Sequence, residues 1–151
     1  MKILILSDRD ESLGQIAKYW LRVISKDLEV YSSGINPEKE IEENTKEFLK
    51  ERGEDLSSYT PNSIKEFTDK AWDYILVISE EANKEIENYK IEFKNKVFYE
   101  FKEIDKDSEN KKEELEEISK EINHTLYFLT EIVFKEKDCN TDNCSCNHCS
   151  K

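Results

Sequence analysis

The residues best suited to chemistry are four cysteines, all of which lie in the last thirteen residues of the chain. They are spaced as C-x4-C, C-x-C and C-x2-C with a histidine before the last one: Cys139, Cys144, Cys146, His148 and Cys149. Thiolates bind soft ions such as Zn²⁺, Cu(I) or As(III), and closely spaced pairs chelate one ion at little entropic cost. A structural zinc site usually pairs two C-x2-C units across a longer loop, so this spacing does not select one metal. We expect soft metal or metalloid binding here; a redox role of the thiols and the absence of a defined role are the alternatives.

A second group of polar residues, Ser7-Asp8-Arg9-Asp10-Glu11-Ser12, follows the apolar run Ile3–Leu6 and precedes an amphipathic segment that begins at Leu13. A buried strand that turns into a helix through a short loop is a common anion site, because the helix start offers free N–H groups and a positive dipole. Three acids against one base give this loop a formal charge of −2, which opposes an anion. The geometry of the loop therefore predicts an anion as the ligand, whereas its charge opposes one.

The residue types in this loop suggest three other roles. Asp8, Asp10 and Glu11 have the oxygen ligands of a Mg²⁺ or Ca²⁺ site, although their spacing matches no known cation loop. Ser7 as a nucleophile needs an adjacent base, and neither His124 nor His148 has a sequence-level reason to lie beside it. Arg9 could supply a cation for an anion, but it is flanked by acids. We therefore expect a serine bonded within its own loop and an arginine in a surface ion pair.

Length and charge limit the remaining function classes. A chain of 151 residues supports one core, and a net charge of −12 argues against nucleic acid or an anionic membrane as a partner. No apolar stretch approaches the ~20 residues of a membrane span, and the amino terminus leads directly into the first strand. We therefore expect no membrane association, a cytoplasmic location and reduced thiols.

Hydrophobic periodicity predicts the elements that must position these groups. Strands are expected at 2–6, 28–32, 72–78 and 97–99, and helices at 13–24, from about 37 to 52, briefly at 60–67 and from 79, and at 109–134. In the turns, Gly34 is expected at positive φ, Pro37 in a first helical turn, and Gly53 at a helix end. Alternating strands and helices predict an α/β three-layer sandwich, with a doubly wound, four-stranded, parallel open sheet and helices on both faces. Residues 138–151 contain no aliphatic or aromatic side chain, so we expect them to form a tail outside the core.

Several short strings in the expected order resemble the low-molecular-weight protein tyrosine phosphatases and the thioredoxin-coupled arsenate reductases. They are Ile3–Leu6, Gln15-Ile16-Ala17, Tyr31–Pro37 (YSSGINP), Arg52–Leu56 (RGEDL) and Asp73–Val77 followed by Glu81-Ala82. The resemblance implies the phosphotyrosine phosphatase I-like fold over a domain that we place at residues 1–137, followed by the cysteine-rich tail 138–151. It also implies that an oxyanion is bound by the loop between the first strand and the first helix, here Ser7, Asp8, Arg9, Asp10, Glu11, Ser12, Leu13 and Gly14, which we call the anion loop.

The anion loop departs from the pattern of this family, whose loop carries a nucleophilic cysteine and an arginine that grips the oxyanion. Ser7 stands at the position of the cysteine, and Leu13 stands at that of the arginine. Glu103 and Asp105 lie nearest the position of the family's general acid, without the proline that follows it. Ser79 stands where the reductases carry a second cysteine. The resemblance thus implies the fold of the family, but the cysteine and the arginine that react with the oxyanion are absent from the loop.

We therefore expect a catalytically inactive relative, a pseudoenzyme with a degenerate loop, whose tail binds a soft metal or metalloid ion. No cofactor is expected for the domain itself, and a protein partner fits an interaction or regulatory role. A divergent tyrosine phosphatase or arsenate reductase is the alternative.

Overall fold

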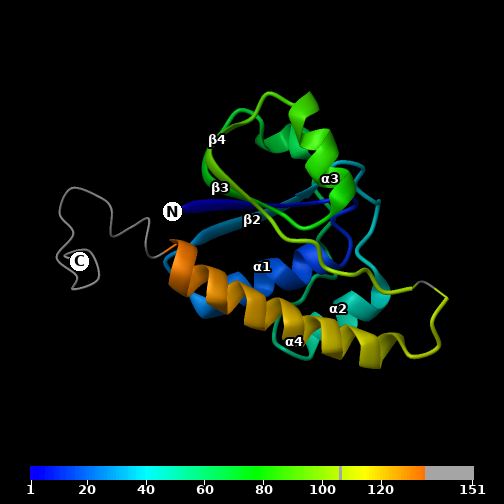
Figure 1. Ribbon diagram of the computed structural model, residues 1–151. Helices are drawn as coiled ribbons and strands as arrows, with labels where there is room; N and C mark the ends of the chain where they lie inside the picture. The colour runs from blue at the N-terminus through cyan, green and yellow to red at the C-terminus, as the bar shows by residue number, and fades with distance from the viewer. Residues whose placement is uncertain (106, 135–151) are drawn as a thin grey trace.

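The computed structural model describes residues 1–105 and 107–134 of the chain (Figure 1). In chain order, its elements are β1 (Lys2–Ser7), α1 (Leu13–Ile24), β2 (Glu29–Gly34), α2 (Glu43–Lys50), the 3-10 turn η1 (Ile64–Phe67), β3 (Ala71–Val77), α3 (Glu80–Glu85), the 3-10 turn η2 (Ile86–Asn88), β4 (Glu92–Phe98), α4 (Lys111–Leu129) and the π-helical turn η3 (Thr130–Phe134). This order reproduces the predicted alternation of strands and helices.

The four strands form one parallel sheet in the order β2-β1-β3-β4. β1 lies at the centre, where Ile3 is opposite Val30 on one side and Tyr74 on the other. All residues of β1 from Ile3 to Leu6 are fully buried, as expected for a parallel strand covered on both faces. The predicted α/β fold with a four-stranded parallel sheet is confirmed, and the carboxyl ends of its strands form one edge.

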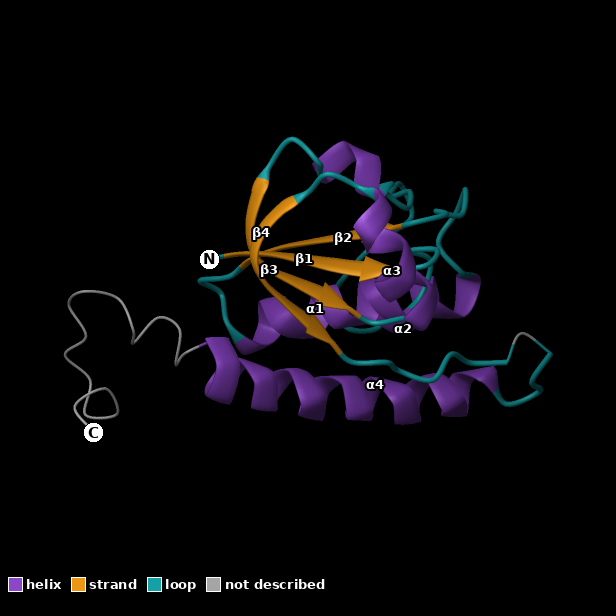
Figure 2. Cartoon of the chain, turned by 45° about the horizontal axis from the view of Figure 1, so that its top comes forward, coloured by secondary structure: helices purple, strands orange, loops and turns teal. Residues whose placement is uncertain are grey.

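Helices cover both faces of this sheet (Figure 2), and a separate hydrophobic cluster lies on each face. α1, α2 and α4 contribute to the larger one, whereas η1, α3 and η2 cover the other. Each face holds one tryptophan. The indole N–H of Trp20 in α1 donates to Ser119 Oγ in α4 at 2.8 Å, and that of the buried Trp72 in β3 donates to the carbonyl of Phe67 at 3.1 Å.

Local differences from the predicted elements have identifiable causes. The second helix begins at Glu43 rather than near Pro37, because the Glu42 side chain caps it by accepting the N–H groups of Asn44 and Thr45. The short helix expected at 60–67 begins only at Ile64, because Ser63 caps it through a capping box with Glu66.

The fourth strand is longer than predicted and begins at Glu92. Its first five residues, Glu92–Lys96, hold one aromatic side chain among charged and polar ones and lack a continuous apolar run, so the hydrophobic pattern alone marked only its end.

The two turn glycines have different roles. Gly53 has φ of +90°, as a left-handed glycine beyond a helix end requires. Gly34 does not have positive φ, so that prediction was wrong; it is the last residue of β2, and a Cβ there would lie 2.9 Å from the carbonyl carbon of Arg9 and 3.0 Å from the amide nitrogen of Asp10. Gly34 is required because two backbones approach each other closely.

α4 runs antiparallel to the strands, from the carboxyl edge of the sheet back to its amino edge (Figure 2). There the rings of Phe134 and Tyr74 are 4.6 Å apart. No helix in the described part of the chain is long and apolar enough to cross a bilayer. The predicted boundary between domain and tail, at residues 137 and 138, lies outside the described residues.

Candidate functional site

A pocket of about 80 Å³ lies at the carboxyl ends of the strands. It is bounded by the anion loop, the start of α2, Ile78 and Ser79 after β3, and the start of α4. Ser7, Leu13, Glu103 and Asp105 all line it, so the residues predicted from two distant stretches of the sequence, 7–13 and 103–105, meet at one cavity. Their chemical roles stay predictions.

Ser7 is held by hydrogen bonds within and next to the loop. Its Oγ accepts the backbone N–H of Asp10 at 3.0 Å and donates to the carbonyl of Ser33 at 3.5 Å. None of the described residues that line the pocket is a histidine, and His124 lies on the exposed side of α4. The hydroxyl therefore lacks an imidazole base in this part of the structure.

Asp10 determines the conformation of the loop through its backbone angle and its buried side chain. Its φ of 55° is in the left-handed region, which aspartate tolerates better than most residues, so the loop can turn here without a glycine. Its carboxylate is buried, with Oδ1 accepting Gln15 Nε2 at 2.9 Å and Oδ2 accepting the N–H of Asn62 at 2.9 Å. Burial raises the pKa of Asp10 to about 6, although Asn62 and the positive charge of Lys18 act in the opposite direction. This residue carried no sequence signal beyond its residue type in a turn.

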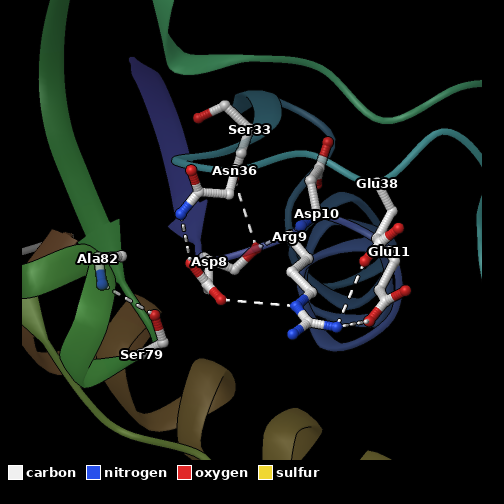
Figure 3. A network of polar contacts seen from close by, with 10 residues as sticks. Asp8, Arg9, Asp10, Glu11, Ser33, Asn36, Glu38, Ser79 and Ala82 are labelled. Atoms are coloured by element: carbon white, nitrogen blue, oxygen red, sulfur yellow. Dashed lines mark hydrogen bonds and ion pairs between the residues drawn. The ribbon is translucent and has the colours of Figure 1, made fainter. Parts of the chain in front are cut away.

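Arg9 lies on the outer side of the loop, where Figure 3 shows it among acids. Its guanidinium is within 3.6 Å of Asp8, 4.0 Å of Glu11 and 3.3 Å of Glu38. Asp8 also accepts the side-chain amide of Asn36 at 3.2 Å. The predicted surface ion pair of Arg9 is confirmed.

The idea of a Mg²⁺ or Ca²⁺ site on Asp8, Asp10 and Glu11 does not hold. Within residues 1–105 and 107–134, no three acidic, cysteine or histidine side chains converge on a point that could hold a metal ion. Asp10 is bonded inward to Asn62, whereas Asp8 and Glu11 pair with Arg9.

Leu13 and Gly14, at the end of the anion loop, are also the first two residues of α1. Leu13 is buried in the larger hydrophobic cluster and forms an apolar wall of the pocket. A Cβ on Gly14 would lie 3.2 Å from Ser7 Oγ and 3.3 Å from Asp10 Oδ1. The absence of a side chain at Gly14 thus lets Ser7 and Asp10 pack against the start of the helix.

The described residues that line the pocket include five carboxylates, Asp10, Glu11, Glu42, Glu103 and Asp105, and two cations, Arg9 and Lys111. Glu42 is engaged as a helix cap, and Ser79 caps α3 through the N–H of Ala82 at 3.1 Å (Figure 3). Glu103 and Asp105 are exposed at the rim. A phosphate would therefore meet an excess of negative charge, without a guanidinium at position 13.

The predicted metal ligands Cys139, Cys144, Cys146, His148 and Cys149 lie outside the described residues. The described chain ends at Phe134 in η3, after α4 has run from the carboxyl edge of the sheet toward its amino edge (Figure 2).

Comparison with known sequences gives a family for most of the chain. Residues 15–138 match the sequence model of the low molecular weight phosphotyrosine protein phosphatases. The match begins directly after Gly14, so the anion loop itself lies outside it. No curated protein matches the chain.

Solved structures share the fold at low sequence identity. A low molecular weight protein tyrosine phosphatase from T. tengcongensis has a TM-score of 0.69 at 18% identity, over 87% of this chain and 98% of that one. A thioredoxin-dependent arsenate reductase from Corynebacterium glutamicum has a TM-score of 0.66 at 23% identity, over 89% of this chain and 62% of that one. The arginine phosphatase YwlE, as a C7S mutant with a phosphorylated active site serine, has a TM-score of 0.64 at 14% identity, over 89% of this chain and 99% of that one.

Proposed function

The chain belongs to the low molecular weight phosphotyrosine protein phosphatase family, and we propose that its domain, residues 1–137, is a catalytically inactive member that serves in interaction or regulation. The observation that carries this proposal is the charge of the pocket. A phosphate dianion needs a cation in contact with its oxygens, and the position expected to supply it is the buried apolar Leu13.

The state of Ser7 supports the same proposal. A serine hydroxyl has a far higher pKa than a cysteine thiol and reacts only when a base removes its proton. Ser7 is bonded to Asp10 and Ser33, and the carboxylates nearest to the general-acid position, Glu103 and Asp105, have no nucleophile to assist. An acid without a nucleophile contributes little to phosphoryl transfer.

Turnover of an aryl phosphate and of arsenate, measured with purified protein and with Ser7→Ala, tests this proposal. We expect both proteins to be equally inactive and neither to bind inorganic phosphate in a calorimetric titration. A Ser7→Cys/Leu13→Arg variant is the matched control, because it restores both reacting groups while leaving the acids in place. Activity of the unaltered protein that disappears in Ser7→Ala would contradict the proposal.

A residual phosphoryl-accepting function is the second candidate. It is favoured by the solved YwlE variant in which a serine introduced by C7S is phosphorylated. Here Ser7 would take up a phosphoryl group and release it slowly. Mass spectrometry of the Ser7 peptide after incubation with acetyl phosphate distinguishes the two functions, because only the second predicts a phosphorylated Ser7.

An arsenate reductase that uses a tail cysteine is less consistent with the fold. From Leu115, which lines the pocket, α4 and η3 lead away for ~28 Å, at 1.5 Å for each residue. Cys139 follows Phe134 by five residues, which span at most ~18 Å even when fully extended. Cys139 therefore cannot return to the pocket, and a thiol there would have to come from farther along the tail.

For the tail, residues 138–151, we propose binding of Zn²⁺, Cu(I) or As(III) through Cys139, Cys144, Cys146, Cys149 and His148. Four thiols within eleven residues support a chelating role, because thiolates prefer soft ions. Elemental analysis of anaerobically purified full-length protein, against a variant with all four cysteines changed to serine, tests it. Equal metal content in the two proteins would exclude this role.

A further inference from the structure

The strand β4, Glu92–Phe98, is the most exposed strand of the sheet. It lies at the end of the strand order, and in the described part of the chain it pairs with β3 on one side only. None of its seven residues is buried. The opposite edge strand, β2, has four buried residues and is partly covered, since Gly34 at its end bridges to Ser63. The two edges of the sheet therefore differ in access.

The backbone of β4 offers unused hydrogen-bonding groups along its outer edge. The N–H of Tyr99, directly after the strand, donates to the carbonyl of Val77 in β3 at 2.9 Å. Backbone groups of a strand alternate in direction, so Val97 and Asn95 also face β3. The N–H and C=O groups of Lys94 and Lys96 then point outward, where another strand can pair with them.

The side chains along this edge carry a net positive charge, although the chain as a whole is negative. Lys90, Glu92, Lys94 and Lys96 fall on alternate positions and give a net charge of +2, in a chain whose net charge is −12. The side chain of Lys94 is 77% exposed and pairs with Asp73 at 3.2 Å. Aromatic rings flank the lysines: Phe93, Phe98 and Tyr99 are each more than a third exposed.

We propose that β4 binds an extended acidic segment of a partner protein, which adds a fifth strand to the sheet. Main-chain hydrogen bonds to the outward groups of Lys94 and Lys96 supply affinity, and carboxylates of the added strand lie over their ammonium groups. The exposed rings of Phe93 and Phe98 contact apolar side chains on the two faces of the added strand.

The charge of the edge also disfavours other occupants. A second copy paired antiparallel in full register would place Lys94 opposite Lys96 of that copy, and like charges in directly opposed positions destabilise a pair of strands. The tail of this chain has no aliphatic or aromatic residue in 138–151 to contact the exposed rings.

The test uses full-length protein labelled with ¹⁵N and a soluble peptide of alternating glutamate and valine, with a lysine–valine peptide as the control. We expect the acidic peptide to shift the amide signals of residues 92–98 and the control peptide to leave them unchanged. Equal binding of both peptides, no binding of the acidic one, or shifts confined to the pocket would overturn the proposal. So would dimerisation through β4 without peptide.

Two variants separate strand addition from simple charge attraction. Lys96→Pro removes one outward N–H without breaking the bonds to β3, and we expect about tenfold weaker binding of the acidic peptide. Lys96→Thr keeps the N–H and loses the charge, and we expect about threefold weaker binding. If Lys96→Pro does not fold, Lys94→Glu/Lys96→Glu replaces it in the test, because we expect this variant not to bind the acidic peptide. Equal affinities of this variant and the unaltered protein for that peptide would overturn the proposal.

Discussion

The charged side chains on the inner and outer sides of the anion loop differ in burial and in the groups that they contact. On the inner side, Asp10 is 1% exposed and its carboxylate is bonded to Gln15 and Asn62. On the outer side, Arg9 is 42% exposed and lies among three acids. The outer side has more ion pairs, but exposed pairs contribute little because water screens them. A single buried carboxylate can therefore affect the stability of the loop more than the whole outer cluster.

The largest expected effect tests the inner side. Asp10→Asn should stabilise the domain at pH 7.5 by up to ~3 kcal/mol, because an amide avoids the cost of burying a charge, still accepts the Asn62 N–H and tolerates positive φ. The loss of the hydrogen bond from Gln15 Nε2, which the amide oxygen cannot accept at the same time, reduces this gain. Urea unfolding of the two proteins at pH 7.5 measures the difference. If Asp10→Asn is less stable at pH 7.5, burial of the charge does not dominate this site.

The pH dependence of that difference has a definite sign. The pKa of Asp10 rises from 3.8 to about 6 on folding, so its protonated form favours the folded state. Its contribution to stability is fully present below about pH 4 and is lost as the pH rises through 6. The gain from Asp10→Asn should vanish near pH 4. Asp73→Asn is the opposite control: the Lys2 N–H lowers the pKa of Asp73, so its contribution is present at neutral pH and is lost as the pH falls through that lowered pKa.

A second substitution tests the contact between the loop backbone and β2. Gly34→Ala should destabilise the domain by ~2 kcal/mol, because its Cβ would meet the backbone of Arg9 and Asp10. The shift of the urea midpoint gives the value. Gly53→Ala is the matched control, since a Cβ there meets nothing within 4 Å and only the φ of +90° opposes it, at a cost of ~1 kcal/mol. Equal effects of the two substitutions would contradict the close approach at Gly34.

The cap of α2, at the pocket wall, should show an intermediate effect. Glu42→Ala removes the acceptor of the N–H groups of Asn44 and Thr45 and should cost ~1 kcal/mol in thermal or urea unfolding. Glu43→Ala, one residue later and 78% exposed, should change stability much less. If both changes cost the same, capping is not the role of Glu42.

The smallest effect is expected on the outer side. Arg9→Gln should change the free energy of unfolding by no more than ~0.5 kcal/mol, and added salt should reduce that difference. Lys84→Gln, which breaks the exposed pair with Glu80, supplies a reference for an ordinary surface ion pair. A loss at Arg9 several times larger than at Lys84 would show that the outer cluster stabilises the loop.

The order of strands and helices could be predicted because each element carries its own hydrophobic period. The strand at Ile3–Leu6 and the helix at Leu13–Leu21 were predicted correctly, because their apolar side chains both form the periodic pattern and are buried in the core. Glu42 and Ser63 were missed as caps because proline nearby gave a stronger local signal of a helix start.

The arrangement of the loop could be predicted only in part. Ser7, Leu13, Glu103 and Asp105 were placed by resemblance, and the pocket does bring them together. The role of Asp10 depends on Asn62, fifty-two residues later, and the role of Gly34 depends on the backbone of Arg9 and Asp10. Contacts between distant segments leave no periodic pattern in the sequence.

The two tryptophans, one on each face of the sheet, give the molecule two separate fluorescent reporters. Trp20 is half-buried between α1 and α4 and reports on the helical layer, whereas the enclosed Trp72 reports on the layer of η1 beside Phe67. Acrylamide should quench Trp20 more readily than Trp72. Single Trp→Phe variants therefore allow the loss of each helical layer to be followed independently as the domain unfolds.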